Sequence, residues 1–194
     1  MDPWDELIAL RLKLPFDAVF ACRTAAWIYG LGGQLARPIE VIMPVHASIR
    51  SRTGLIVRRS NLVPEEVTTR RTLPVSGLHR TLRDLSLFYA RVEALAAIDT
   101  ALYKRLTTKG RLFTDPVTAR GRRGSARLRR LVEMAEPAES PMETRLRWLL
   151  STRRLPKAQV QAKLRGDRIL RFTARDVHQH ADVVEAQVRI ALAA

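Results

Sequence analysis

The spacing of apolar side chains predicts two helices at the start of the chain. Apolar residues fall at helical spacing at Trp4, Leu7, Ile8 and Leu12, and Pro15 ends the segment that contains them. A second helix is predicted over residues 22–29, because Gly30 follows it with the backbone freedom that commonly ends a helix.

Two β-branched segments, 38–44 and 54–60, predict a pair of neighbouring strands. The stretch between them, 46–53, is polar and basic, as expected for the tip of a hairpin. Shorter extended pieces follow over 67–71 and 73–76. Two helices followed by a β-ribbon predict a winged-helix-like module or a small α/β module.

The middle of the chain is predicted to be helical. Ser76 is the expected N-cap of a helix that carries leucines at helical spacing. Further helices are predicted over residues 92–102 and around residues 128–132. Another helix is predicted to start at Ser140, with Glu143 three residues later as its capping-box partner.

The last part of the chain predicts two more strands and a closing helix. The strands, 160–164 and 168–173, are separated by only three residues, which is enough for a hairpin turn. The helix is predicted over residues 181–192. Asp176, His178 and Asp182 could suggest acid–base chemistry, but their expected role is to start this helix, because acids interact well with the positive end of a helix dipole.

Positive charge is concentrated in one segment. The 194 residues contain 34 Lys and Arg against 19 Asp and Glu. Residues 1–103 carry a net charge of +3, residues 104–175 carry +14, and residues 176–194 carry −2. Such a field concentrates polyanions and releases counterions when phosphates bind. The alternative is a solvated, arginine-rich surface with no nucleic-acid partner.

Ten arginines form the predicted nucleic-acid-binding set, because guanidinium forks suit phosphate oxygens. Four lie in the predicted hairpin and the strand after it, and six lie within residues 119–130. They are Arg50, Arg52, Arg58, Arg59, Arg120, Arg122, Arg123, Arg127, Arg129 and Arg130. The helix over residues 22–29 offers only Arg23 as a charged side chain, so base reading by this helix is not expected.

Several properties exclude other classes of protein. The single cysteine, Cys22, cannot form an intrachain disulfide; it suits a reducing cytosol and is expected to be buried. No apolar run is long enough to span a membrane, and the acidic N-terminus is not a secretory signal, so a cytoplasmic protein with no membrane partner is expected. No metal ligand is predicted, because the cysteine is far in sequence from most of the histidines and their spacing does not suit zinc. The histidines are His46, His79, His178 and His180.

Blocks within the first half of the chain resemble the AbiEi-type antitoxin family. They are RTAAWIYGL (23–31), PIEVIMP (38–44), GLIVRRS (54–60), and LHRTLRDLS (78–86) followed by AAIDTAL (96–102). Members of that family are usually winged-helix DNA-binding proteins of abortive-infection toxin–antitoxin systems. The resemblance therefore implies DNA as a partner, together with a cognate toxin protein.

The C-terminal region resembles the Vsr-like endonuclease domain of the PD-(D/E)XK superfamily. The matching blocks are SPMETRLRWLL (140–150), LPKAQVQ (155–161) and RILRFTARDVHQHADVVEAQVRIAL (168–192). Chains of actinobacterial type combine an AbiEi-like and a Vsr-like domain in this order, so the order of the two regions agrees with both resemblances.

The nuclease centre that this second resemblance implies is incomplete in the sequence. Acids of the core strands in that superfamily bind a divalent metal, which activates water. Between residues 150 and 171 the only acid is Asp167, in the predicted turn. Glu143 matches a helix acid that assists the metal site in some relatives, but a capping role is expected here. Because Mg²⁺ prefers several oxygen ligands, we predict no catalytic residue, with Glu143 as a relic at most, and no cofactor.

The sequence thus predicts an α+β chain in three parts. They are an AbiEi-like, winged-helix-type module (1–104), a basic helical connector (105–136), and a shortened, restriction-endonuclease-like α/β remnant (137–194). The main hypothesis is a non-catalytic DNA-binding protein, a regulator of toxin–antitoxin type. Three alternatives stay open: a Mg²⁺-dependent nuclease completed by another chain, a module that neutralises a toxin by protein contact, and a decayed gene product. The sequence leaves the oligomeric state unknown.

Overall fold

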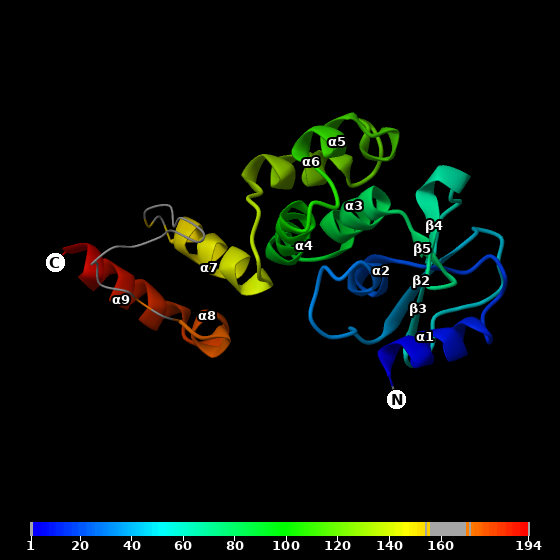
Figure 1. Ribbon diagram of the computed structural model, residues 1–194, viewed down its shortest axis with the longest axis horizontal. Coiled ribbons are helices and arrows are strands. Elements are labelled where there is room, and N and C mark those ends of the chain that lie inside the picture. The colour runs from blue at the N-terminus through cyan, green and yellow to red at the C-terminus, as the bar shows by residue number, and fades with distance from the viewer. Residues whose placement is uncertain (1, 154, 156–169, 171, 194) are drawn as a thin grey trace.

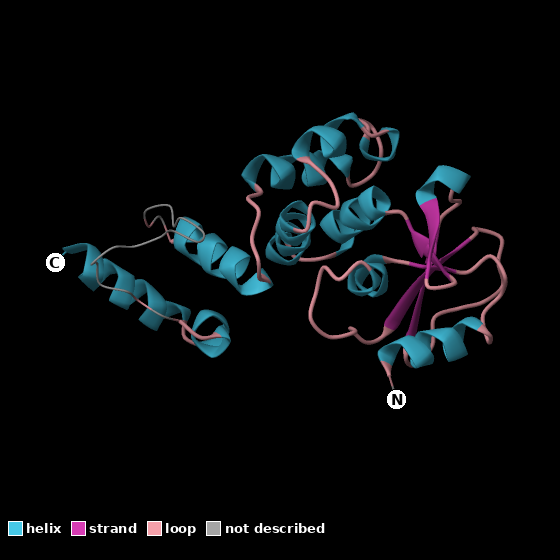
Figure 2. Cartoon of the chain, viewed as in Figure 1, coloured by secondary structure: helices cyan, strands magenta, loops and turns pink. Residues whose placement is uncertain are grey.

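The computed structural model describes residues 2–153, 155, 170 and 172–193. The described strands all belong to the first 76 residues, and helices make up most of the remainder (Figures 1 and 2). The chain is therefore of the α+β class, as the sequence predicts.

The helices and strands follow the predicted order closely. The helices are α1 (Pro3–Arg11), α2 (Cys22–Ile28), α3 (Leu78–Phe88), α4 (Arg91–Tyr103), α5 (Lys109–Thr114), α6 (Ser125–Met134), α7 (Pro141–Thr152), α8 (Ala174–Gln179) and α9 (Ala181–Ala193). The strands are β1 (Val19–Phe20), β2 (Ile39–Met43), β3 (Leu55–Arg59), β4 (Val67–Arg70) and β5 (Leu73–Ser76), and two short 3-10 turns are η1 (Pro64–Glu66) and η2 (Pro116–Thr118). The sequence did not predict β1, α5 or α8, which are short.

The strands form one mixed sheet in the order β3-β2-β1-β5-β4. Strand β2 runs parallel to β3, and β1 runs parallel to β5, whereas the other two pairs are antiparallel. All five residues of β2 are buried. Its alternate residues Ile39, Val41 and Met43 share a core cluster with Leu7 of α1, while Ile42 packs with Cys22 in a second cluster. This sheet is thus covered on both faces around β2.

The predicted hairpin over residues 38–60 is wrong, although its two strands are neighbours. Ile39 pairs with Leu55 and Met43 with Arg59 in parallel register. A tight hairpin joins antiparallel strands, so residues 44–54 form a return connection and not the tip of a wing. The winged-helix interpretation is therefore not confirmed by this sheet.

The predicted cap of α3 also differs. Gly77 occupies the N-cap position, and Ser76 still pairs with Val67 as the last residue of β5. The Ser76 hydroxyl instead lies 2.8 Å from the Thr81 hydroxyl in the first turns of α3. Strand β5 therefore includes Ser76, the residue that was expected to cap the helix, and the helix begins one residue later than expected.

Helices α3, α4 and α6 share a second core, to which α5 contributes Leu112. They lie between the sheet and α7, and α9 lies at the far side of α7 from the sheet (Figure 1). Leu82, Ile98 and Leu128 are among the side chains buried completely in this layer. The basic connector therefore contributes its apolar side chains to the same core as the helices before it.

The C-terminal region is joined to this layer through α7, which packs against α4. Most of the two strands predicted over 160–164 and 168–173 lies outside the described residues. The closing helix predicted over 181–192 is confirmed by α9. No helix in the described ranges is long and apolar enough to cross a membrane.

Candidate nucleic-acid interface

Half of the ten predicted arginines are committed to contacts within the protein or lie against a carboxylate. Arg58 is the clearest case, because its Nη2 donates to Glu40 Oε2 at 3.0 Å and its guanidinium lies 3.9 Å from the Phe88 ring centroid. It therefore joins β3 to β2 and to the C-terminal end of α3 and is not a free phosphate ligand.

Glu40 is the buried centre of that contact. It is the second residue of β2 and has no exposed surface, and it accepts hydrogen bonds from Arg23 Nε at 3.1 Å, from Arg58 and from the Tyr89 hydroxyl. Burial, and next the Glu40 carboxylate, raises the pKa of Tyr89 to about 12, so this phenol stays a hydrogen-bond donor. The sequence contained one signal for this cluster, a single acid in the apolar segment PIEVIMP, which the sequence analysis did not use.

Arg127 and Arg129 of α6 also make contacts within the fold. Arg127 Nη2 donates to the Tyr89 carbonyl at 2.8 Å. Arg129 Nη1 donates to the Phe113 carbonyl at 2.9 Å, and its guanidinium lies 4.8 Å from the Phe113 ring centroid. The two side chains thus join α6 to the end of α3 and to α5.

Five predicted arginines keep exposed side chains that bond to no part of the chain that the structure describes. They are Arg50, Arg52, Arg120, Arg123 and Arg130. Arg122 is also exposed, with a long contact of 3.4 Å from its Nη1 to Glu66 Oε1. The remaining one, Arg59, donates to the carbonyls of Pro44 and Ile49 and touches no described carboxylate.

A surface groove of about 470 Å³ collects the connector arginines. Its basic lining comes from Arg120, Arg122, Arg123 and Arg129, and no acid lines it. The turn that presents them depends on two glycines, Gly121 and Gly124, at φ values of +87° and +90° that other residues rarely adopt. Neither Arg50 nor Arg52 lines this groove.

A second cavity, of about 250 Å³, lies beside the groove. It is bounded by the end of β3, by η1, by α3 and by the turn before α6. Arg59 lines it together with Arg122 and Arg123, so the two predicted basic segments meet here. Sequence reasoning missed the other charged residues of this cavity, Glu66, Arg80, Arg83 and Asp84, because η1 and α3 are adjacent only in the folded chain.

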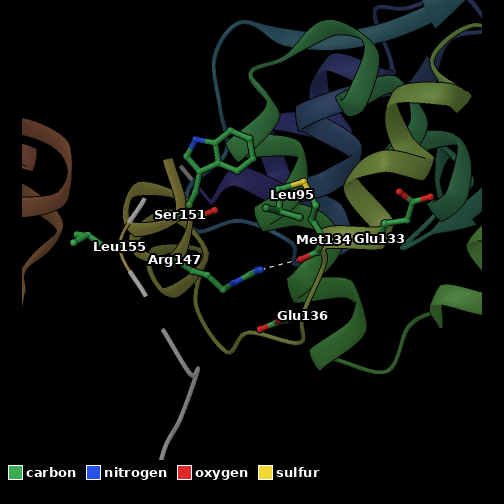
Figure 3. A pocket seen from close by; sticks show the side chains of 8 residues that line it. Leu95, Glu133, Met134, Glu136, Arg147, Ser151 and Leu155 are labelled. Carbon is green, nitrogen blue, oxygen red and sulfur yellow. Dashed lines mark hydrogen bonds between the residues drawn. The ribbon is translucent and has the colours of Figure 1, made fainter. Parts of the chain in front are cut away.

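A third cavity, of about 330 Å³, lies between α4, α6 and α7. Figure 3 shows Arg147 reaching the Met134 carbonyl across it, at 2.9 Å. Arg147 also donates to Asp99, which has no exposed surface and accepts from Thr144 Oγ1 at 2.7 Å. Burial raises the pKa of Asp99, opposed by the bond from Thr144 and the charge of Arg147. These contacts attach α7 to α4.

Glu143 lies at the start of α7 as a capping residue, as predicted. Its backbone N–H donates to Ser140 Oγ at 3.3 Å, and its Oε1 accepts from the same hydroxyl at 3.0 Å. Within the described ranges, no group of three or more His, Cys, Asp or Glu side chains could hold a metal ion. Glu143 is thus engaged at the helix start.

Cys22 and His79 occupy structural positions. Cys22 is buried, as predicted, and burial raises the pKa of its thiol. The His79 ring lies between Asp115, 2.7 Å from Nδ1, and Thr107, 2.7 Å from Nε2. The imidazole thus joins the start of α3 to the segment that contains α5.

The comparison with family models gives one match. The model of the AbiEi antitoxin C-terminal domain matches residues 18–134. The chain belongs to this family. Neither the curated proteins nor the solved structures gave a match.

The AbiEi match extends from β1 to the end of α6 and includes both the groove and the cavity beside it. It therefore runs beyond residue 104, where the resemblance had been expected to end, through the basic connector. The match does not reach residues 137–194, so the Vsr-like endonuclease resemblance of that region stays a prediction, as does the division into three parts.

Proposed function

We propose that this AbiEi-family protein is a regulator of toxin–antitoxin type that binds DNA without cleaving it, through the groove formed by the connector arginines. The observation that carries the proposal is the lining of that groove, where four arginines meet and no acid is present. The family membership supports the regulatory role and implies a cognate toxin as the protein partner.

The physics of the groove favours phosphate over base contacts. Arg120 and Arg123 are exposed and contact no described carboxylate, so binding a phosphate would not require a native ion pair to break. Arginine forks bind phosphate oxygens in two parallel hydrogen bonds. Contacts of this kind position a duplex without reading its sequence. We therefore expect binding that depends strongly on salt and weakly on sequence.

The non-catalytic part of the proposal rests on the position of Glu143. Its Oε1 and its N–H are both used with Ser140 at the helix start, and one carboxylate is a poor site for Mg²⁺. The nuclease alternative remains distinct, because it predicts Mg²⁺-dependent nicking of plasmid DNA that is lost in Glu143→Ala. The cytoplasmic location suggested by the lone cysteine remains a prediction.

The test measures the binding of duplex DNA to the full chain by fluorescence anisotropy over a range of salt concentrations. The variant Arg120→Ala/Arg123→Ala is expected to bind all duplexes more weakly, and the slope of log affinity against log salt should flatten by about 0.9 for each lost phosphate contact. The matched control is Lys13→Ala/Arg91→Ala, which removes the same charge from exposed positions outside the groove.

Two results would contradict the proposal. One is the absence of measurable duplex binding at low salt. The other is an equal loss of affinity in the groove variant and the control, which would attribute binding to net charge and not to the groove. A protein that captures its toxin in high salt but binds no DNA would favour the alternative of neutralisation by protein contact.

A further inference from the structure

The cavity between β3, η1, α3 and the turn before α6 contains an excess of positive charge. Five arginines and two carboxylates line its volume of about 250 Å³. The arginines are Arg59, Arg80, Arg83, Arg122 and Arg123, and the carboxylates are Glu66 and Asp84. Because carboxylates carry one charge each, three of the cationic charges have no counterpart among these lining residues.

The two carboxylates are already used by the buried arginines. Arg80 donates to Asp84 Oδ2 at 2.8 Å and to Glu66 Oε2 at 3.1 Å. Its third contact is the Ser60 hydroxyl at 3.2 Å. Glu66 Oε1 lies 3.4 Å from both Arg83 and Arg122. This network is rigid, because Glu66, Arg80 and Asp84 are almost completely buried.

Arg83 shares both of its carboxylates with other arginines. Its side chain is 8% exposed, and its Nη2 lies 3.4 Å from Glu66 Oε1. Its Nε lies 3.9 Å from Asp84 Oδ1 and has no hydrogen-bond acceptor in the described part of the chain. Burial, and next the charge of Arg80, lowers the pKa of the Arg83 guanidinium, and Asp84 and Glu66 only partly oppose this. A buried cation that is crowded by another cation gains stability from any anion that enters the cavity.

The rim of the cavity supplies two further cations. Arg59 and Arg123 line it and contact no described carboxylate. The volume is below the range of about 300–1,000 Å³ that is typical of pockets for drug-sized ligands, which suits an anionic group and not a whole large molecule. A terminal phosphate carries about −1.5 to −2 charges at pH 7 and would offset at least half of this excess of three positive charges.

We propose that this cavity is a binding site for a terminal phosphate group, a phosphomonoester, which the rim arginines reach from outside and the arginines of α3 attract from within. This site goes beyond the duplex binding proposed above: it shares Arg122 and Arg123 with the groove, but its other arginines, Arg59, Arg80 and Arg83, do not line the groove. Two sources share this chemistry, a free phosphate or mononucleotide and the 5′-phosphorylated end of a nucleic acid.

The test places a carboxylate where the phosphate would bind. Asn61 lines the cavity, and its Oδ1 accepts from the Val45 N–H at 3.1 Å, so Asn61→Asp keeps this bond and adds one negative charge. Ser60→Asp places a charge closer to Arg80. The matched control is Gln34→Glu, the same change of charge at an exposed position that does not line the cavity.

Binding is measured on the full chain by calorimetry and by thermal shift. The probes are inorganic phosphate, a mononucleotide, and one single-stranded oligonucleotide prepared with a 5′-phosphate and with a 5′-hydroxyl.

Phosphate is expected to raise the Tm of the wild type and of Gln34→Glu. Asn61→Asp is expected to bind phosphate about tenfold more weakly. A tenfold change in the dissociation constant corresponds to about 1.4 kcal/mol of binding free energy. Duplex affinity of Asn61→Asp should fall far less than that of Arg120→Ala/Arg123→Ala.

Each outcome is decisive. Preference for the phosphorylated oligonucleotide over its hydroxyl form, lost in Asn61→Asp, supports the site and assigns it to nucleic-acid ends. If phosphate or the mononucleotide binds more tightly than either form of the oligonucleotide, and the two forms bind equally, the site is supported and is assigned to free ligands. No phosphate-dependent shift in the wild type, or equal losses in Asn61→Asp and Gln34→Glu, overturns the proposal. If Ser60→Asp fails to fold, Asn61→Asp still provides the test.

Discussion

Arginines serve opposite purposes in two regions of this molecule. At the junction of α4 and α7, Arg147 is 9% exposed and contacts Asp99, which is completely buried. In the turn before α6, Arg120 and Arg123 are exposed and contact no described carboxylate. The same side chain therefore stabilises the fold in one place and remains available to an external anion in the other.

The difference between these regions lies in the carboxylate and not in the arginine. A buried acid such as Asp99 or Glu40 must be compensated, because removing one partner of a buried pair leaves a desolvated charge. Arginines near such an acid become part of the structure. Arg120 and Arg123 lie in the connector, where acids are scarce, and remain free to interact with phosphates. Substitutions at both kinds of site test this distinction.

Asp99→Ala should cause the largest loss of stability, about 3–5 kcal/mol, because it leaves Arg147 buried without its anion. The loss is measured as the change in the free energy of unfolding in urea. Replacing both partners together, Asp99→Leu with Arg147→Met, should cost less than the single change, since no buried charge then remains. A single change that costs under about 0.5 kcal/mol, as surface substitutions do, would show that this pair does not attach α7 to α4.

Glu40→Gln should cost about 1.5–3 kcal/mol, since it weakens charged hydrogen bonds to Arg23 and Arg58 that are only partly buried. It should also lower the pKa of Tyr89 from about 12, because the neighbouring carboxylate is one of the causes of the raised value. A phenol whose pKa is raised on folding contributes stability below its unfolded pKa of about 10 and loses it as pH rises through the folded value.

The raised pKa of Tyr89 sets the pH range in which folding stability should change. Wild-type stability should decline between pH values of about 10 and about 12, and the decline should be smaller in Glu40→Gln. The Tyr89 titration is followed by ultraviolet absorbance, with Tyr89→Phe as the control that removes the signal. An unchanged phenol pKa in Glu40→Gln would contradict the contact between these two side chains.

Gly124→Ala should cost about 1–3 kcal/mol, because φ at this position is +90° and an added Cβ would lie 3.2 Å from the Arg83 carbonyl and from Leu87 Cβ. The turn that presents Arg122 and Arg123 should therefore be distorted, and duplex affinity should fall with stability. Gly33→Ala is the control, since no atom lies within 4 Å of a Cβ there. Equal effects of the two substitutions would rule out the close approach of this turn to α3.

Arg120→Ala/Arg123→Ala should have the smallest effect on stability, within about 0.5 kcal/mol, because neither side chain has a partner among the described residues. Its effect on DNA affinity, described above, should nevertheless be large. This combination of unchanged unfolding and weakened binding is the opposite of what Asp99→Ala should show. A marked loss of stability in this variant would place the connector arginines with the structural group.

Local signals in the sequence were sufficient for most elements. The stripe of α1, the β-branched segments of β2 and β3, and the cap of α7 at Ser140 and Glu143 all follow from neighbours within a few residues. The concentration of arginines between residues 119 and 130 is likewise visible without a structure. The roles of individual arginines were not visible, so Arg58, Arg127 and Arg129 were assigned to nucleic acid although they contact Glu40, Tyr89 and Phe113.

Local patterns along the chain were thus enough to predict most of the helices, most of the described strands, the excess of positive charge and the family. Only the tertiary structure decided that β2 and β3 run parallel, which arginines meet a buried carboxylate, and that Arg59 and Arg123 line one cavity although 64 positions separate them. The physical reason is that propensity and capping act between near neighbours, whereas strand direction and charge compensation depend on segments that become adjacent only when the core forms.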